Sequence, residues 1–212
     1  TFVNVKEWYI FMSKKVYLFD FDGTVTSADT LLHFIRFACG TWRFLLGFFL
    51  HSPMIVAMKL KLCDNGKTKQ KVFSWFFRGM NIDVFDNLCK RFATENFNLM
   101  RPKATDLLNR LFRDNEDIVI VSASLVNWVS PFFTHIQRDS KSNFHVLGTI
   151  PEVKDGVITG RFLTYNCYGA EKVHCIRRLY PDRENYHFIA FGDSNGDKQM
   201  LAFADESYYR IF

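Results

Sequence analysis

Apolar runs and helically spaced apolar positions alternate along this chain. Short runs of Val, Ile, Phe and Tyr predict buried strands, and apolar residues three or four positions apart predict amphipathic helices. The predicted strands of a main sheet are 16–19, 117–121, 186–191 and 208–212. The predicted helices between them are 102–112, 126–133, 171–179 and 198–204. Strands that alternate with helices in this way are typical of a parallel sheet with helices on both faces.

One long segment departs from this alternation. Residues 31–62 are almost uniformly apolar and aromatic, and residues 72–98 have apolar positions at helical spacing. We therefore predict a small helical insertion over 31–99. The α/β domain that carries it comprises 14–30 and 100–212.

Within the insertion, the longest uncharged run is 44–58, and His51, Ser52 and Pro53 interrupt it. A membrane-spanning helix needs roughly 20 consecutive apolar residues, so we predict that this run does not cross a membrane. Aromatic and aliphatic residues in and just before this run are instead expected to form the core of the helical bundle and its contact with the main domain. The residues of this predicted core are Phe37, Trp42, Phe44, Leu45, Phe48 and Phe49.

Two turn signals complete the predicted architecture. Asp64-Asn65-Gly66 has the residue types of a turn between two helices of the insertion. Short strands at 144–148, 150–153 and 157–162 lie around Asp155-Gly156, which predicts a β-hairpin.

Composition narrows the class of protein. The 212 residues are 48% hydrophobic, enough to bury one core with a small insertion. The net charge of +5 suits an anionic substrate or surface but is too small to indicate nucleic-acid binding. Five cysteines, an odd number without a CxxC pair, indicate neither a disulfide framework nor a zinc site, and favour a reducing compartment such as the cytoplasm. Residues 1–13 do not resemble a signal peptide, and we interpret them as an N-terminal extension, with Met12 as an alternative start.

Polar side chains follow three of the predicted strands. They are Asp20, Asp22, Ser122, Asp193 and Asp197. The carboxyl ends of parallel strands line one crevice, so these groups are expected to meet there, and Lys172, at the start of a helix, can reach the same edge. Two carboxylates held together need a cation, a shared proton or solvent. Taken alone, the first pair could also be solvated carboxylates at a strand end.

Four motifs occur in a recognisable order. They are DFDGT at 20–24, an apolar strand that ends at Ser122, GAEKV around Lys172, and GDSNGD at 192–197. This order resembles the haloacid-dehalogenase-like phosphohydrolases, over residues 14–212. A helical insertion between the first two motifs is similar to that of the phosphoserine-phosphatase-like subgroup. The resemblance implies a three-layer, Rossmann-like parallel sheet with an α-helical cap.

The resemblance also implies roles for the acidic residues. Asp20 would attack phosphorus and form an aspartyl-phosphate, and Asp22 would act as general acid and then as general base. A Mg²⁺ ion would lie between the Asp20 carboxylate, the backbone carbonyl of Asp22 and Asp193. Asp197 would orient metal-bound water or Lys172 from behind these ligands.

The remaining motif residues would hold the phosphoryl group. Ser122 and Lys172 would bind its oxygens, and Thr24 would support the loop or contact the phosphate. Asp29 lies where phosphoserine phosphatases use an acidic residue to hold the amino group of the substrate, but the position before Thr30 favours the alternative that it is the N-cap of a helix.

This chain departs from the subgroup in two places. Gly196 stands where those enzymes typically have Asn, which puts in doubt any role that depends on a side-chain amide there. Ser122 is followed by Ala-Ser instead of Gly-Gly.

The sequence therefore predicts a Mg²⁺-dependent phosphatase of a small phosphorylated metabolite. An alternative is a lipid phosphate at a membrane surface, because the insertion resembles that of phosphatidylglycerophosphate phosphatases in having an apolar region followed by a basic stretch. Arg36, Arg43, Lys59 and Lys61 flank the apolar run, as at a membrane interface. A third hypothesis is a catalytically silent relative that binds phosphorylated ligands. The substrate, the balance between hydrolysis and phosphoryl transfer, and the oligomeric state stay open.

Overall fold

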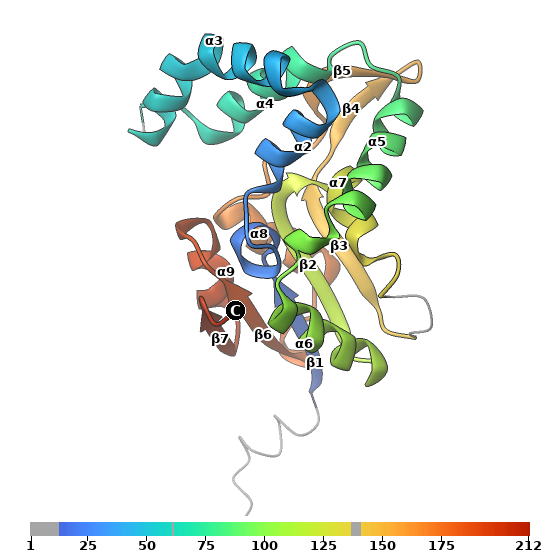
Figure 1. Cartoon of the computed structure of the whole chain (residues 1–212). Coiled ribbons are helices and arrows are strands. Elements are labelled where there is room, and N and C mark those ends of the chain that lie inside the picture. Colours follow the sequence, from blue (N-terminus) through green and yellow to red (C-terminus); the bar gives the residue numbers. More distant parts are fainter. Residues whose placement is uncertain (1–12, 61, 137–140) are drawn as a thin grey trace, which may run out of the picture.

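The computed structural model describes residues 13–60, 62–136 and 141–212, so all but the last residue of the predicted N-terminal extension lies outside the described chain. Five parallel strands form the main sheet in the order β3-β2-β1-β6-β7, with β1 at its centre (Figure 1). They are β1 (Lys14–Phe19), β2 (Asp117–Leu125), β3 (Phe144–Thr149), β6 (Tyr186–Gly192) and β7 (Glu206–Tyr209).

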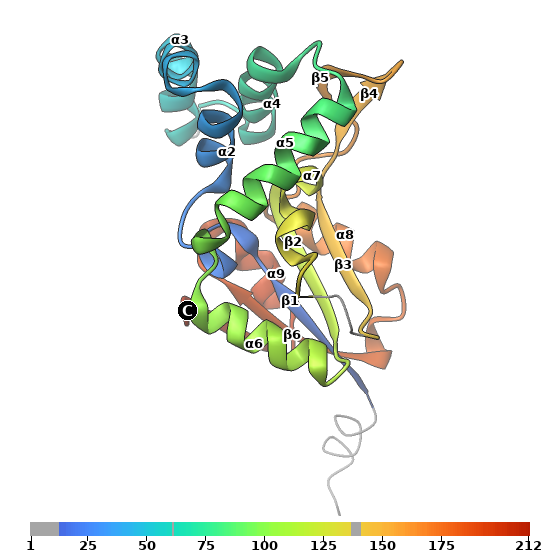
Figure 2. The same cartoon turned by 45° about the vertical axis from the view of Figure 1, so that its right-hand side comes forward.

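Alternating side chains of β1 build a core on each face of this sheet. Val16 and Leu18 pack with residues of α8 (Ala170–Leu179) and α9 (Lys198–Phe203). Tyr17 and Phe19 point to the other face, where α6 (Pro102–Arg113), α7 (Val126–Val129) and a 3-10 turn (Ser130–Phe133) contribute Leu108, Trp128 and Phe132. Figure 2 shows α6 and α8 on opposite sides of the strands. The predicted three-layer α/β fold is confirmed.

Four helices between β1 and α6 stand above the carboxyl end of the sheet (Figure 1). They are α2 (Thr30–Cys39), α3 (Thr41–Lys59), α4 (Asn65–Phe77) and α5 (Ile82–Glu95). The antiparallel hairpin of β4 (Pro151–Lys154) and β5 (Val157–Phe162) rises beside them. Backbone bonds from Gly79 N to Ile158 O and from Ile82 N to Gly156 O, each 2.9 Å, tie the hairpin to the α4–α5 connection.

Three predicted boundaries were wrong. Asn65 and Gly66 belong to the first turn of α4, because the Asp64 carboxylate caps the helix by accepting from Lys67 N at 2.7 Å. β2 continues past Val121 to Leu125, with a shift in its register against β3. β7 ends at Tyr209 instead of continuing to residue 212, because Arg210 adopts a left-handed backbone conformation (φ 56°).

The predicted interruption at His51, Ser52 and Pro53 does not end α3, which continues through all three residues. Proline lacks the N–H that would bond to the carbonyl of Phe49, but Ser52 Oγ donates to that oxygen at 2.8 Å. His51 Nδ1 likewise lies 2.8 Å from the Gly47 carbonyl. Side-chain donors thus satisfy carbonyls along this part of the helix.

The predicted aromatic core of the insertion is only half correct. Phe37, Phe44 and Phe48 are partly buried and pack against the core, whereas Trp42, Leu45 and Phe49 are exposed. The buried aromatic residues of the insertion are instead supplied by α2, α4 and α5. They are Phe34, Phe73, Phe76, Phe77, Phe85 and Phe92.

Candidate active site

β1 delivers Asp20 to the carboxyl edge of the sheet, and the chain then makes one wide helical turn. Thr26 N donates to Phe21 O at 2.9 Å and closes this turn. Gly23 within it has φ 88°, and a β-carbon there would lie 2.6 Å from Oδ2 of Asp193. Glycine is therefore required both for the backbone conformation and for the close approach of Asp193.

Behind the turn, a buried lysine joins two carboxylates. Lys172 Nζ donates to Asp20 Oδ1 at 2.5 Å and to Asp197 Oδ1 at 2.7 Å, and all three residues are buried. Burial and the nearby charge of Asp197 raise the pKa of Asp20 to about 7, against the opposing charge of Lys172. Burial lowers the pKa of Lys172, but its two carboxylate partners outweigh burial and raise it above its usual value, so the lysine is held as an ammonium.

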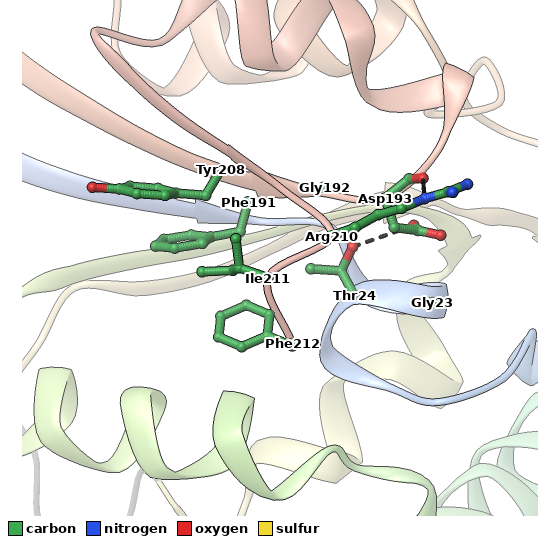
Figure 3. Close-up of a pocket in the computed structure, with 9 residues that line it drawn as sticks. All are labelled: Gly23, Thr24, Phe191, Gly192, Asp193, Tyr208, Arg210, Ile211 and Phe212. Carbon is green, nitrogen blue, oxygen red and sulfur yellow. Dashed lines mark hydrogen bonds between the residues drawn. The ribbon is translucent and has the colours of Figure 1, made fainter.

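Asp193 faces the same cluster from the end of β6. Thr24 Oγ1 lies 3.3 Å from Asp193 Oδ1 and 3.3 Å from Asp20 Oδ2, so it can donate to either carboxylate. Burial, with the charge of Asp197, raises the pKa of Asp193. On its outer side, Asp193 lines a small pocket together with Gly23, Tyr208 and Phe212, and Arg210 Nε donates to the backbone carbonyl of Asp193 at 2.8 Å (Figure 3).

The carboxylates of Asp20, Asp193 and Asp197 have oxygens within 4.8 Å of one another. Three carboxylates and the Lys172 ammonium leave a formal excess of two negative charges, and oxygen donors of this kind suit Mg²⁺. Within the cluster, Asp197 is the least available ligand, because Oδ1 bonds to Lys172 while Oδ2 accepts from Asp193 N, Ser194 N and Ser194 Oγ. The donor set therefore fits a divalent cation on the side of Asp20 and Asp193.

The Asp22 carboxylate is turned away from this cluster. Its Oδ1 accepts from Thr30 N at 2.7 Å and from Thr30 Oγ1 at 2.5 Å, and its Oδ2 accepts from Ser124 Oγ at 2.6 Å. Thr30 is the first residue of α2, and Ser124 belongs to β2. Asp22 is thus held between the insertion and the main sheet.

Two further polar residues meet at the carboxyl-terminal end of β2, Ser122 of the strand itself and Lys69 of α4. Ser122 is fully buried, and its Oγ accepts from Ser124 N at 3.0 Å. Lys69 reaches across from α4 and donates from Nζ to Ala123 O at 2.6 Å. Burial lowers the pKa of Lys69, although the charges of Asp22 and Asp29 oppose this shift.

Sequence reasoning missed Ser124 and Lys69. Ser124 could have been predicted, because it lies two residues after Ser122 and side chains two positions apart on a strand point to the same face. Lys69 could not have been predicted, because the sequence of a basic stretch does not show which lysine points inward. Its neighbours Lys67 and Lys71 are exposed.

Asp29 forms the N-cap of α2, with Oδ1 accepting from Leu31 N at 3.0 Å. This is the alternative that its position before Thr30 suggested. Its predicted contact with substrate stays a prediction.

Comparisons with known proteins agree with this geometry. The sequence model of the haloacid dehalogenase-like hydrolases matches residues 17–202. Protein CicA of Caulobacter vibrioides is 34% identical over 199 residues, which cover 92% of this chain and 85% of CicA. A Bordetella pertussis protein of unknown function has the same fold, with a TM-score of 0.78 at 14% identity over 92% of this chain and 89% of the other. A substrate-bound phosphoserine phosphatase gives a TM-score of 0.61 at 18% identity over 92% and 85%. The predicted family is confirmed, and this chain belongs to the haloacid dehalogenase-like hydrolases.

Proposed function

We propose that this protein is a Mg²⁺-dependent phosphomonoester hydrolase that forms an aspartyl-phosphate on Asp20. The observation that carries the proposal is the buried contact between Asp20 and Lys172 at the end of the central strand, beside Asp193. Lys172 holds Oδ1 of Asp20, and Oδ2, which lies 3.3 Å from Thr24 Oγ1, would be the oxygen that attacks phosphorus.

Asp20, the backbone carbonyl of Asp22 and Asp193 would hold the metal. When bound, Mg²⁺ would screen the repulsion between the attacking carboxylate and the anionic phosphate. Lys172 and Ser122 would stabilise charge on the phosphoryl oxygens. Asp197 would keep Lys172 charged and in place, as its 2.7 Å bond supports.

Asp22 would move the protons in both steps. In the first, an Asp20 oxygen bonds to phosphorus, the bond from phosphorus to the alcohol oxygen breaks, and Asp22 gives its proton to the departing alkoxide. In the second, Asp22 takes a proton from water as the water oxygen attacks phosphorus, and the Asp20–phosphorus bond breaks to release inorganic phosphate. Its bonds to Thr30 and Ser124 support a fixed orientation for this group.

The test is hydrolysis of p-nitrophenyl phosphate with and without Mg²⁺. Wild type should turn over only with the metal, and Asp20→Asn should lose at least about a thousandfold of kcat. A phosphoryl group found on Asp20 by mass spectrometry after a rapid acid quench would support the intermediate. Absence of turnover in wild type, or unchanged turnover in a folded Asp20→Asn variant, would exclude the mechanism and favour a catalytically silent phospho-ligand-binding protein.

A panel of phosphomonoesters then addresses the substrate. We propose a small metabolite, so phosphoserine, sugar phosphates and nucleotides should include one substrate with a much higher kcat/KM than p-nitrophenyl phosphate. Turnover confined to a phospholipid monoester would favour the lipid alternative. Added glycerol that diverts product from inorganic phosphate would reveal phosphoryl transfer. We also propose a cytoplasmic location, which the five free cysteines support.

A further inference from the structure

Helix α3 has one face fixed to the protein. Arg43 Nη2 donates to Phe76 O on α4 at 3.1 Å, and its guanidinium lies 5.7 Å from the ring centre of Trp75. A β-carbon at Gly47 would collide with the rings of Trp75 and Phe76, so the two helices are in direct contact there. This contact sets which side of α3 faces outward.

The outward face of α3 carries large exposed apolar side chains over most of its length. They are Trp42, Leu45, Leu46, Phe49, Leu50 and Val56, and exposed Ser52 and Pro53 lie between the last two. Trp42 is 85% exposed and Phe49 is 77% exposed, although an outward helix face in a water-soluble bundle is normally polar. Figures 1 and 2 place α3 at the outer limit of the insertion. At 1.5 Å per residue, the residues from Trp42 to Val56 make an apolar strip about 21 Å long.

The same region has a strongly one-sided charge. Residues 30–63 contain no Asp or Glu, whereas they contain Arg36, Arg43, Lys59 and Lys61. The Arg36 side chain is exposed, and its Nε lies 3.4 Å from Thr41 Oγ1 at the start of α3. This segment of the chain therefore carries cations and no anion, and Arg36 is an exposed cation near the start of the strip.

We propose that the outer face of α3 docks onto an anionic lipid bilayer. A second copy of this chain is a poorer occupant, because a two-fold interface would bring together two copies of a segment that contains basic and no acidic residues. An anionic bilayer offers apolar chains for the strip and negative headgroups for the basic residues of the segment, and Trp42 has the amphipathic ring that prefers the headgroup level.

The helix lies on the bilayer and does not cross it. In the described part of the chain, the window Thr41–Met58 is the one segment with the length and hydropathy of a spanning helix, at a mean hydropathy of 1.2. Its inner face is held against α4 by Gly47 and Arg43, so lipid can reach only one side. An in-plane orientation exposes the strip to lipid and keeps the α3–α4 contact.

Sedimentation with lipid vesicles tests the proposal. The full chain should sediment with vesicles of phosphatidylcholine and phosphatidylglycerol, and much less with phosphatidylcholine alone or in high salt. The double variant Trp42→Gln/Phe49→Gln should bind the anionic vesicles at least about tenfold more weakly, because it removes two large apolar groups from the contact. Arg36→Gln should weaken binding to anionic vesicles alone.

A matched control changes two apolar residues that are exposed elsewhere. Val84 on α5 and Tyr209 on β7 are about half exposed, and Val84→Gln/Tyr209→Gln should bind like wild type. Thermal unfolding of each variant checks that it is folded. Asp20→Asn should also bind like wild type, because docking does not depend on the proposed chemistry.

Two results would overturn the proposal. One is wild-type protein that stays in solution with anionic vesicles, or a folded Trp42→Gln/Phe49→Gln variant that binds as tightly as wild type. The other is a dimer, seen by light scattering, that the same double variant converts to a monomer, because a second copy would then cover the strip.

Discussion

At the scale of single residues, the site depends on one buried ammonium. Lys172 has a carboxylate on either side, Asp20 at 2.5 Å and Asp197 at 2.7 Å, and water reaches none of the three groups freely. A buried pair of this kind contributes little net stability compared with apolar packing, but removal of one partner leaves an uncompensated charge.

Lys172→Met should therefore lower the free energy of unfolding by about 3–5 kcal/mol at neutral pH. The loss should shrink as the pH falls, because protonation of Asp20 and Asp197 removes the unpaired negative charge. Urea denaturation at several pH values measures both effects. Lys198→Met, at an exposed position, is the control and should change stability by less than about 0.5 kcal/mol. Equal stability of the two variants would contradict this account of Lys172.

A second residue-scale prediction concerns a pair of thiols on either side of Lys172. Cys167 and Cys175 have Sγ atoms 4.0 Å apart, and Arg178 Nη2 lies 3.0 Å from the Cys175 sulfur. The hydrogen bond from Cys167 and the contact with Arg178 lower the pKa of Cys175 to about 7, although burial opposes them.

Iodoacetamide should consequently alkylate Cys175 with a half-maximal rate near pH 7, and more slowly below it as the thiolate is protonated. Arg178→Gln should move this midpoint to higher pH. Peptide mass spectrometry resolves Cys175 from the exposed Cys63, which serves as an internal control. A midpoint that does not respond to Arg178→Gln would show that the guanidinium has no part in it.

At this scale, the sequence correctly indicated the position of those site residues that directly follow the end of a strand. Asp20, Asp193 and Asp197 were expected at one edge, and the structure brings them within one cluster with Lys172. Their order along the chain and the parallel topology were enough. Ser124 was not foreseen, because its bond to Asp22 depends on β2 continuing past the point where its apolar run ends.

At the scale of elements, α4 connects the insertion to the site. Its buried face supplies Phe73 and Phe77 to the core. The side chain of Lys69 extends from the same helix and donates to Ala123 O on β2. The bond at 2.6 Å holds the insertion against the end of β2, where Ser122 is proposed to bind phosphate.

Lys69→Met should lower kcat/KM for a phosphomonoester by about tenfold or more, since it removes both a cation near the proposed phosphate site and a contact that closes the insertion. Lys71→Met, an exposed position on the same helix, is the control and should leave kcat/KM within about twofold. Steady-state kinetics compares the two. If both variants match wild type, Lys69 acts only as a structural contact.

The elements also differ in how far sequence could predict them. Strands β1, β2 and β6 of the central sheet were predicted because their Val, Ile and Phe runs have no competing pattern, whereas β3 was grouped with the hairpin strands that follow it in the chain. The insertion was predicted as helical, but the burial of its faces was not, since α3 is apolar on both sides and a hydrophobic pattern then cannot say which side is covered. The end of β7 depends on the backbone of Arg210, which bonds through N to Gly192 O and cannot be read from local preferences.

At the scale of the whole molecule, charge is divided between two regions. The acidic cluster lies at the edge of the main sheet, and residues 30–63 of the insertion contain only basic charged residues. The acidic cluster, which is the proposed metal site, and this basic segment therefore belong to different parts of the fold.

Mg²⁺ should raise the melting temperature of the wild-type protein, because an ion that binds the folded cluster stabilises it by mass action. Asp193→Asn should reduce this shift, since it removes one carboxylate from the proposed ligand set. Differential scanning fluorimetry across a Mg²⁺ series measures the effect, and Asp106→Asn on α6 is a control that should keep the full shift. A shift of equal size in Asp193→Asn would place the ion elsewhere.

The position of Thr30 has a consequence for timing. This residue starts α2, the first helix of the insertion, and also gives the Asp22 carboxylate two of its three hydrogen bonds. Any movement of the insertion that carries Thr30 away would release Asp22 in the same event. Substrate would then enter a site in which Asp22 is not yet oriented to donate its proton. A phosphoryl group on Asp20 would not be hydrolysed until the insertion had moved back and Asp22 could again take a proton from water. The first residue of α2 would in that way determine when Asp22 is in position for each of the two steps of the reaction.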